Sequence, residues 1–476
     1  MPNTENTETQ HLHDGGLYRL LPSVNELLLT PECESLLDSY SRRQLLNAAR
    51  ATLAELRREI ASHQHTAESL NLTLATLADR IMKHLSASRK YSLRPVINAT
   101  GVILHTNLGR APLSESALQH IAEAASDYCN LELDLETGTR SRRDIHVEAL
   151  LLKALKIDDS DQYGVVIVNN CAAATFLALN SLAEKQEVIV SRGELVEIGG
   201  GFRIPEILEK SGAILKEVGT TNRTRVSDYE RALSSSTALI LRVHQSNFSI
   251  DGFTERSALA DLVSLARRAG VPIFEDQGTG LLASLAPYGI AGEPTLPDSL
   301  AQGVYLVAAS GDKLLGGPQS GLLVGRKELI ERIQKNPLLR AFRVDKLTYA
   351  ALEATLLDYV SESFDSIPLH RMLGIRPEEL MRRCRQIADE LHSSRLMVDV
   401  VSVESLVGGG TAPRAALPSS ALSVHHAVLS AEELLSALRL LDPPIIARIS
   451  EGAVLLDLRT VPPHLDSDFA SLLSKL

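Results

Sequence analysis

The sequence of 476 residues has no tryptophan, only four cysteines and an aromatic content of 4%. The cysteines are widely spaced, so they form neither a paired disulfide framework nor a CxxC metal site. We therefore expect reduced thiols and no bound metal. No apolar run is long enough to span a membrane, and the polar, acidic N-terminus lacks the basic start and apolar stretch of a secretory signal. These absences predict a cytoplasmic protein with no membrane role.

Positive charge is also scarce, with 48 Lys and Arg against 59 Asp and Glu and a formal net charge of -11. Phosphate binding depends on Lys and Arg neutralising charge, so this balance excludes a protein whose whole surface binds nucleic acid. Any contact with nucleic acid must be local. The hydrophobic content of 44% and the length together predict a globular chain of two or three domains.

Residues 1–92 read as a helical domain. Ser23 and Glu26 stand three apart, the spacing of a helix capping box. Apolar positions then recur at helical spacing over residues 45–60 and, after a polar break, over residues 70–85. The first forty residues are acidic, whereas basic residues crowd the second half; taken alone, such a run is usually a solvated helical face. The basic residues are Arg42, Arg43, Arg50, Arg57, Arg58, Lys83, Arg89 and Lys90.

From residue 93 onward, short β-branched runs alternate with helical stretches, which is the pattern of a doubly wound α/β domain. We predict a large α/β domain over residues 93–343 and a small α+β domain over residues 344–476. The small domain has expected strands at residues 397–403, 421–424 and 445–457. The large domain has seven expected strands, at residues 164–168, 187–191, 214–218, 238–243, 271–274, 304–308 and 321–324.

Lys313 stands in a glycine-rich turn, Ser310 to Gly321, between two expected strands. A lysine that forms a Schiff base needs partial desolvation to lower its pKa, and small neighbours let a planar cofactor approach the backbone. A lone lysine near glycines is more often a surface residue. Its neighbours in the expected sheet change that interpretation.

Two other strand ends carry groups that a pyridoxal 5'-phosphate site needs. Asp276 follows the strand 271–274, where an acid would keep the pyridine nitrogen protonated. Asn170, Cys171 and Ala172 begin a helix after the strand 164–168, and free amides there suit a phosphate. Alone, each is more commonly a turn or a packing feature. In this chain order, with Lys313, they predict the aspartate-aminotransferase-like arrangement called fold type I. Dinucleotide binding is disfavoured because no GxGxxG follows an early strand.

Three polar connections, residues 191–203, 219–224 and 243–248, fall where such folds line the cofactor cleft. His244 in the third lies near the cofactor or is a structural histidine. Arg340 and Arg343 would share one face if their stretch is helical. Forked guanidinium groups suit phosphate-like anions, with surface ion pairing as the equal alternative. The arginines outside the first domain that we single out are Arg110, Arg140, Arg142, Arg143, Arg340 and Arg343.

Several of these segments together resemble bacterial selenocysteine synthase, the L-seryl-tRNA(Sec) selenium transferase family. The resembling blocks are residues 93–98, 105–110, 190–200, 218–224 and 310–319, in the family's order, and the likeness covers nearly the whole chain. The block around Lys313 is the most specific. Two positions depart from the family pattern: Cys171 stands where a third asparagine is more frequent, and Gln277 where a leucine is more usual.

The resemblance implies a pyridoxal-phosphate enzyme that converts L-seryl-tRNA(Sec) to L-selenocysteinyl-tRNA(Sec). The route would pass through a cofactor-bound aminoacrylyl intermediate, with selenophosphate as the selenium donor and a freed Lys313 as the proton carrier. The basic N-terminal helices resemble the family's tRNA-binding domain, which would confine phosphate contacts to one patch. Relatives form rings of dimers, so a homo-oligomer, most simply a decamer, is implied.

The resemblance also assigns roles to individual residues. Arg110, Arg340 and Arg343 correspond to the family's arginines for the anionic selenium donor. Thr220 and Thr221 correspond to its active-site threonines.

Two other functions stay open at this point. The first is a pyridoxal-phosphate lyase or transferase acting on a small free amino acid, for which Arg459 would bind the substrate carboxylate. The N-terminal helices speak against it. The second is a catalytically silent tRNA-binding scaffold, against which the intact Asp276 and Lys313 speak.

Overall fold

The computed structural model describes residues 16–89, 91–198, 201–248, 250–412 and 415–476, and the chain divides into two compact units, residues 1–95 and 96–476. The boundary between the two units, after residue 95, falls three residues beyond the boundary predicted after residue 92. The division of the second unit at residue 343 stays a prediction. Outside the described residues lie the acidic residues 1–15, Lys90 of the basic set and Gly199–Gly200 of one polar connection, and the side chain of Arg89 is not described either.

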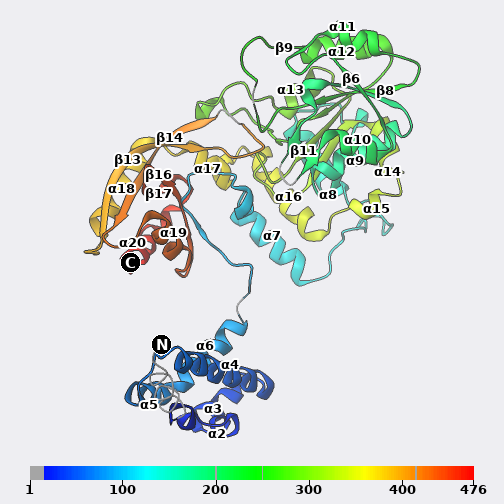
Figure 1. The fold of residues 1–476 in the computed structure, drawn as a ribbon. Coiled ribbons are helices and arrows are strands. Elements are labelled where there is room, and N and C mark those ends of the chain that lie inside the picture. The colour runs from blue at the N-terminus through cyan, green and yellow to red at the C-terminus, as the bar shows by residue number, and fades with distance from the viewer. Residues whose placement is uncertain (1–15, 90, 199–200, 249, 413–414) are drawn as a thin grey trace, which may run out of the picture. The chain divides into compact units, whose positions relative to one another are not determined.

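The N-terminal unit is helical, as predicted (Figure 1). Its helices are α2 (Val24–Leu28), α3 (Pro31–Ser35), α4 (Arg42–Ala61), α5 (Ala67–Ala75) and α6 (Leu77–Arg89). The capping box of Ser23 and Glu26 is present, and Ser41 and Thr66 cap α4 and α5 in the same way. The apolar pattern over residues 70–85 runs through two helices, because α5 ends at Ala75 and α6 begins at Leu77. Leucines and isoleucines from α4, α5 and α6 fill a core of the unit's own.

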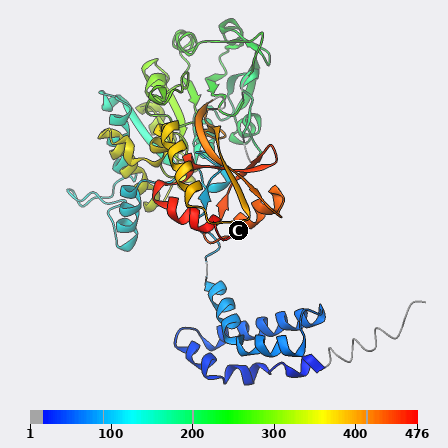
Figure 2. The ribbon, with the colours of Figure 1, turned by 90° about the vertical axis from the view of Figure 1, so that its left-hand side faces the viewer.

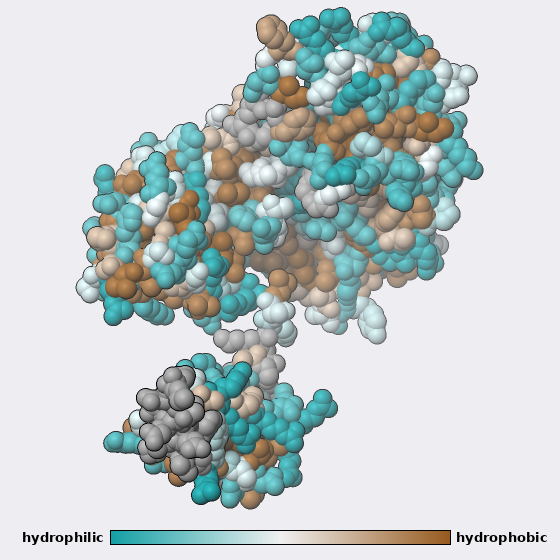
Figure 3. Space-filling view, viewed as in Figure 1, coloured by the Kyte–Doolittle hydropathy of each residue, from teal (hydrophilic) through white to brown (hydrophobic). Residues whose placement is uncertain are grey.

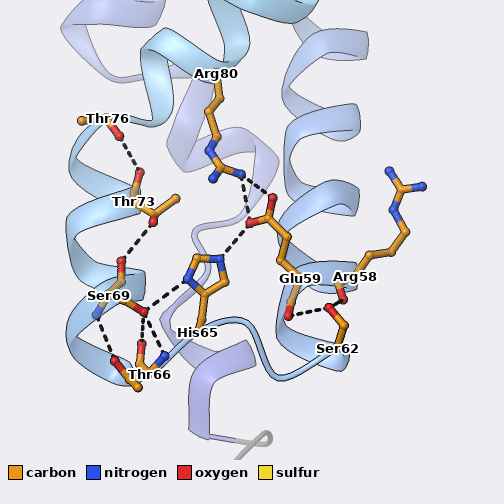
Figure 4. Close-up of polar contacts among 9 residues, drawn as sticks. All are labelled: Arg58, Glu59, Ser62, His65, Thr66, Ser69, Thr73, Thr76 and Arg80. Carbon is orange, nitrogen blue, oxygen red and sulfur yellow. Dashed lines mark hydrogen bonds and ion pairs between the residues drawn. The ribbon is translucent and has the colours of Figure 1, made fainter. Parts of the chain in front are cut away.

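A polar cluster ties three segments of this unit together (Figure 4). From α6, Arg80 donates from one guanidinium nitrogen to both oxygens of Glu59 on α4, at 2.9 and 3.0 Å. From the connection before α5, His65 Nε2 lies 2.8 Å from the same carboxylate, and its other ring nitrogen lies 3.4 Å from Ser69 Oγ. Burial alone would raise the pKa of Glu59, but these bonds outweigh it and lower the pKa. The carboxylate therefore stabilises the packing of α4 against α5 and α6 as an anion.

The second unit is built on a mixed sheet of seven strands in the order β2-β12-β11-β10-β8-β3-β6 (Figures 1 and 2). All seven predicted strands are confirmed, and only β12 runs antiparallel to its neighbours. The carboxyl ends of the other six therefore lie at one edge. The strands are β2 (Tyr163–Val168), β3 (Glu187–Ser191), β6 (Ile214–Val218), β8 (Thr237–Val243), β10 (Ile273–Asp276), β11 (Leu306–Ser310) and β12 (Gly321–Arg326).

Helices cover both faces of this sheet, because successive strand residues point to opposite sides. Val165 and Ile167 pack into one core with α8, α12, α13 and α16, whereas Val166 and Val168 pack into another with α9, α10 and α14. The helices of this region are α7 (Glu115–Ser126), α8 (Ile145–Ala154), α9 (Cys171–Ala183), α10 (Ile204–Ser211), α11 (Val226–Ala232), α12 (Leu259–Ala269), α13 (Leu296–Ala301), α14 (Lys327–Gln334), α15 (Leu339–Phe342) and α16 (Lys346–Val360).

The C-terminal residues add a four-stranded antiparallel sheet, β13-β14-β17-β16, with its own core (orange to red in Figure 2). The expected strand over residues 445–457 is divided into three, because a turn at Glu451 and Gly452 reverses the chain. Its first part, β15 (Ile445–Ile446), pairs with β1 (Ile97–Asn98). The other elements are α17 (Pro368–Gly374), α18 (Pro377–Glu390), β13 (Leu396–Leu406), β14 (Ala416–His426), α19 (Ala431–Arg439), β16 (Arg448–Ser450), β17 (Ala453–Asp457) and α20 (Asp466–Leu473).

Among the described residues, no helix is long and apolar enough to cross a membrane. Figure 3 shows hydrophobic residues in patches between hydrophilic ones on the visible face of each unit.

The Glu59 cluster yields a prediction about stability. Glu59→Gln removes the charge that Arg80 and His65 share, so we expect α4–α6 to lose about 1 kcal/mol of stability, which is typical of a partly buried, hydrogen-bonded ion pair. Hydrogen exchange of the α4 amides in the full-length protein measures the change. Glu55→Gln is the matched control, since Glu55 on the same helix pairs with His84 and is more exposed than Glu59. Equal protection in both variants would contradict the stabilising role of Glu59.

Candidate active site

The predicted site residues follow the carboxyl ends of different strands at one edge of the sheet. Asn170 comes after β2, Thr220 after β6, His244 after β8 and Lys313 after β11, and Asp276 ends β10. Parallel alignment of these strands is what gathers residues so distant in sequence.

Lys313 lies in a tightly bonded turn and is 6% exposed. Leu314 N donates to Thr279 O at 2.9 Å, and Gly316 N donates to Lys313 O at 2.9 Å. Burial is the main cause that lowers the pKa of Lys313, and the Arg110 guanidinium acts in the same direction. The amine is therefore easier to deprotonate than that of a surface lysine, which is what an attack on an aldehyde requires.

Arg110 approaches the lysine turn from another part of the chain. Its guanidinium donates to Asp312 Oδ2 at 2.7 Å, and Asp312 Oδ1 accepts from Ser310 at 2.7 Å. Arg110 adopts a left-handed backbone conformation (φ 62°), which costs a non-glycine residue energy and directs it back toward the turn. Of the three arginines predicted for the selenium donor, Arg110 is the one that the structure places beside Lys313.

Asp276 is buried at the end of β10, and both its oxygens accept hydrogen bonds from α9. Thr175 Oγ1 donates to Oδ2 at 3.0 Å, and Cys171 Sγ lies 3.4 Å from Oδ1. Burial raises the pKa of Asp276, and these two bonds oppose the rise. The carboxylate is held in place for a positively charged partner, which the ring nitrogen of the predicted cofactor would supply.

The start of α9 has the form expected for an anion site. The Asn170 side chain caps the helix by accepting from Ala173 N at 2.8 Å. The amides of Cys171 and Ala172 are the first of the helix and precede any intrahelical partner. Cys171, however, directs its side chain to Asp276, which the sequence did not indicate.

His244 pairs with an acid in the structure, since its Nε2 lies 3.2 Å from Glu293 Oε2. Its backbone N donates to Asp276 O at 2.9 Å, so it lies next to the buried acid. The side chain of His244 is therefore satisfied, as the structural alternative expects, and its position near the cofactor stays a prediction. His244 also lines a cavity of about 500 Å³ together with Gln245 and Arg256.

The three polar connections, residues 191–203, 219–224 and 243–248, contact one another. This agrees with the expectation that all three line the same cleft. Gln245 donates to Gly193 O at 2.8 Å, and Ser191 Oγ lies 2.7 Å from Thr224 Oγ1. A cavity of about 150 Å³ lies between them and is lined in part by Thr221. Thr220 is exposed and bonds to Arg223 O at 3.1 Å. Within the described residues, no hydrogen bond joins either threonine to Lys313 or Asp276.

The prediction that Arg340 and Arg343 share a helix face is wrong. Helix α15 ends at Phe342, and Arg343 is extended (φ -66°, ψ 141°) because its backbone bridges to Val168 at the end of β2. Arg340 is exposed. Arg343 Nη1 lies 3.4 Å from Glu132 Oε1.

Glu132 accepts further bonds from two arginines named at the sequence level. Arg143 Nε donates to Oε1 at 2.8 Å and Arg140 to Oε2 at 2.7 Å, and these bonds lower the pKa of Glu132. Arg142 pairs with Glu148 instead. Ion pairs thus engage Arg110, Arg140, Arg142, Arg143 and Arg343. Within the described residues, no hydrogen bond or ion pair joins Arg110 to Arg340 or Arg343.

Sequence reasoning missed a buried chain of hydrogen bonds behind the lysine turn. Tyr359 OH donates to the carbonyls of Leu314 and Leu315, at 3.3 and 3.0 Å, and lies 2.9 Å from His370 Nε2. His370 Nδ1 lies 3.0 Å from Tyr288 OH. When the His370 proton is on Nε2, Tyr288 OH donates to His370 Nδ1, His370 Nε2 donates to Tyr359 OH, and Tyr359 OH donates to the lysine turn. These residues come from separate elements, so no local sequence pattern could have indicated them.

The residues present fit pyridoxal phosphate. Two glycines border Lys313 and Asp276, so that no side chain stands against these groups there: a Cβ on Gly410 would lie 3.4 Å from Lys313 Nζ, and one on Gly278 would lie 3.6 Å from Asp276 Oδ1 and 3.9 Å from Nζ. An amine of lowered pKa, a buried acid and a helix start at one sheet edge define a fold-type-I pyridoxal-phosphate enzyme.

Comparison with known proteins gives the family. A family model described as L-seryl-tRNA selenium transferase matches residues 96–462, and one described as selenocysteine synthase N terminal matches residues 18–57. The L-seryl-tRNA(Sec) selenium transferases of Carboxydothermus hydrogenoformans and Aquifex aeolicus are 45% and 43% identical over 448 and 447 residues, 94% of this chain in each case and 94% and 95% of theirs. The chain belongs to the L-seryl-tRNA selenium transferase family.

A solved structure agrees on the fold. D-glucosaminate-6-phosphate ammonia-lyase is similar with a TM-score of 0.55 and 20% identity, covering 80% of this chain and 95% of that one. The fold-type-I prediction is confirmed.

The hydrogen-bonded chain yields a prediction about pH. Burial lowers the pKa of His370 from 6.5 to about 4, so folding favours the neutral ring. The contribution of His370 to the free energy of unfolding is fully present above pH 6.5 and is lost as the pH falls toward 4. The loss is about 2 kcal/mol at pH 5. Thermal unfolding of wild type and His370→Gln between pH 7 and 4 measures it. The variant should lose less stability over this window, and parallel curves would contradict the assignment.

Proposed function

We propose that this chain converts L-seryl-tRNA(Sec) to L-selenocysteinyl-tRNA(Sec) with pyridoxal 5'-phosphate as cofactor. The observation that supports this most is similarity over nearly the whole chain, at both the lysine-bearing unit and the N-terminal helices. The order of phosphate site, ring acid and lysine along the chain, with all three at one edge of the sheet, agrees with it.

The roles of the residues follow from their positions. The cofactor, when bound, withdraws electrons from the substrate Cα. Lys313 would hold its aldehyde and, once released, carry the proton at Cα, for which its lowered pKa suits it. Asp276 would accept a hydrogen bond from the protonated ring nitrogen and so keep that proton in place. The amides at Cys171 and Ala172 would bind the phosphate, and Arg110 beside Asp312 supplies positive charge for an anionic donor.

The structure speaks against the free-amino-acid alternative. Arg459, its candidate for the substrate carboxylate, is 2% exposed. Nη1 donates to the carbonyls of Met372 and Ile375, Nη2 to that of Pro418, and Nε to Ser405 Oγ. Each nitrogen of the guanidinium already donates to the protein. A seryl group esterified to tRNA has no free carboxylate, so it does not need such an arginine.

The N-terminal unit supplies a surface that suits RNA. Arg43, Arg50 and Arg57 are exposed and recur every seven residues along α4, so they form one line along its surface. Regularly spaced guanidinium groups suit a phosphate backbone. We assign this unit to tRNA binding.

The remaining parts of the proposal rest on the family resemblance. They are selenophosphate as the donor, bound with the help of Arg340 and Arg343; contacts of Thr220 and Thr221 with the substrate; His244 beside the cofactor; a ring of dimers, most simply decameric; and a cytoplasmic location.

The reaction is tested by single-turnover conversion of radiolabelled seryl-tRNA(Sec) with selenophosphate, using free serine as the alternative substrate. We expect conversion on tRNA alone. Lys313→Ala should abolish conversion and the visible absorbance of the lysine-bound cofactor, because it removes the amine that would form the Schiff base. Turnover of free serine alone would instead establish the small-molecule lyase.

The tRNA surface is tested by Arg50→Glu combined with Arg57→Glu. Each lost phosphate contact should lower the slope of log affinity against log salt by roughly 0.7 to 0.9 and weaken binding, while cofactor absorbance stays unchanged. Filter retention of seryl-tRNA over a salt series measures both effects. Arg267→Glu with Arg268→Glu, two exposed positions on α12, is the matched control. Equal losses in the two double variants would refute the assignment.

A further inference from the structure

Thr175 bonds differently from other buried threonines in helices of this protein. Thr52 on α4 and Thr355 on α16 each donate to the carbonyl four residues earlier, at 3.0 and 2.8 Å. This is the usual bond of a helical threonine. The Thr175 hydroxyl is directed instead to Asp276 Oδ2 at 3.0 Å, and the residue is fully buried.

Cys171 lies on the same side of α9, because residues four apart share a helix face. Its thiol is directed to the other oxygen of Asp276, at 3.4 Å. One helix face therefore presents a hydroxyl to Oδ2 and a thiol to Oδ1. The two donors differ in strength, since a thiol is a weak donor and the contact is long.

The two oxygens also differ in what lies beside them. A Cβ on Gly278 would lie 3.6 Å from Oδ1 and 3.9 Å from Lys313 Nζ, so this glycine borders both Oδ1 and the lysine amine. Oδ1 is therefore the oxygen that faces the lysine side of the acid. It is also the oxygen that has the weaker protein donor.

We propose that Thr175 is a positioning residue for Asp276, holding Oδ2 permanently, while the Cys171 thiol occupies Oδ1 until the ring nitrogen of the cofactor donates to that oxygen. This inference rests on the proposed cofactor. It assigns to the Cys171 side chain a role at the ring acid, beside the backbone role at the phosphate. Asp276 is thus oriented before the cofactor arrives, and only its weaker bond is exchanged.

The experiment compares two ligands on the apo-protein: pyridoxal phosphate and its analogue with CH in place of the ring nitrogen. Thr175→Val keeps the shape of the side chain and removes the hydroxyl. We expect it to weaken pyridoxal phosphate by about tenfold, the usual effect of one hydrogen bond to a charged group, and to leave the analogue within about twofold. Thr355→Val is the matched control and should leave both affinities within about twofold.

Equal weakening of both ligands by Thr175→Val would overturn the positioning role, because it would show a general loss of structure.

The thiol is tested separately by its S–H stretching band, identified by its loss in Cys171→Ala. Loading pyridoxal phosphate should shift this band toward that of a free thiol, and the analogue should not shift it. An unchanged band would overturn the role of Cys171. If the wild-type apo-protein binds neither ligand, the proposed cofactor itself is wrong. This result differs from equal weakening of both ligands in the variant, so failure of the cofactor proposal and failure of the positioning role can be told apart.

Discussion

The burial of an acid and an amine at the same sheet edge is the constraint on which the site depends. Neither Asp276 nor Lys313 is stable as an isolated charge away from water, so each needs partners supplied by other elements. Two donors on α9 face the acid, and a chain of buried hydroxyl and imidazole groups fixes the lysine turn. The mixed sheet is the frame that brings these elements together.

Much of this could be predicted from the sequence, because strand periodicity and glycine-rich turns are local signals. The seven strands were found with small shifts at their ends; Asp276 is the last residue of one of them and Lys313 follows another. Where the signal was not local, prediction was incomplete. The spacing of Arg340 and Arg343 indicated a shared helix face, but a bridge to Val168 extends the chain there. Tertiary pairing overrode the helical spacing.

The direction in which side chains point was the other property that the sequence could not predict. The sequence placed Cys171 at a helix start, where the backbone matters, and gave no indication that its thiol meets an acid 105 residues away. Thr175 could have been found from its four-residue spacing to Cys171, had the thiol contact been known. Tyr359 and His370 lie on α16 and α17, outside every segment that carried a motif.

The separate core of the N-terminal helices has a consequence for how such an enzyme can change over time. Because those helices fill their own interior, the exposed line of arginines lies outside the core of the N-terminal unit and can be substituted without repacking that core. Under the proposed assignment of this unit to tRNA binding, recognition of a changing tRNA and preservation of a fixed chemistry are separate problems for selection. The N-terminal unit could then follow its proposed RNA partner by drift in surface charge, while the other unit keeps an interior in which few residues can be exchanged.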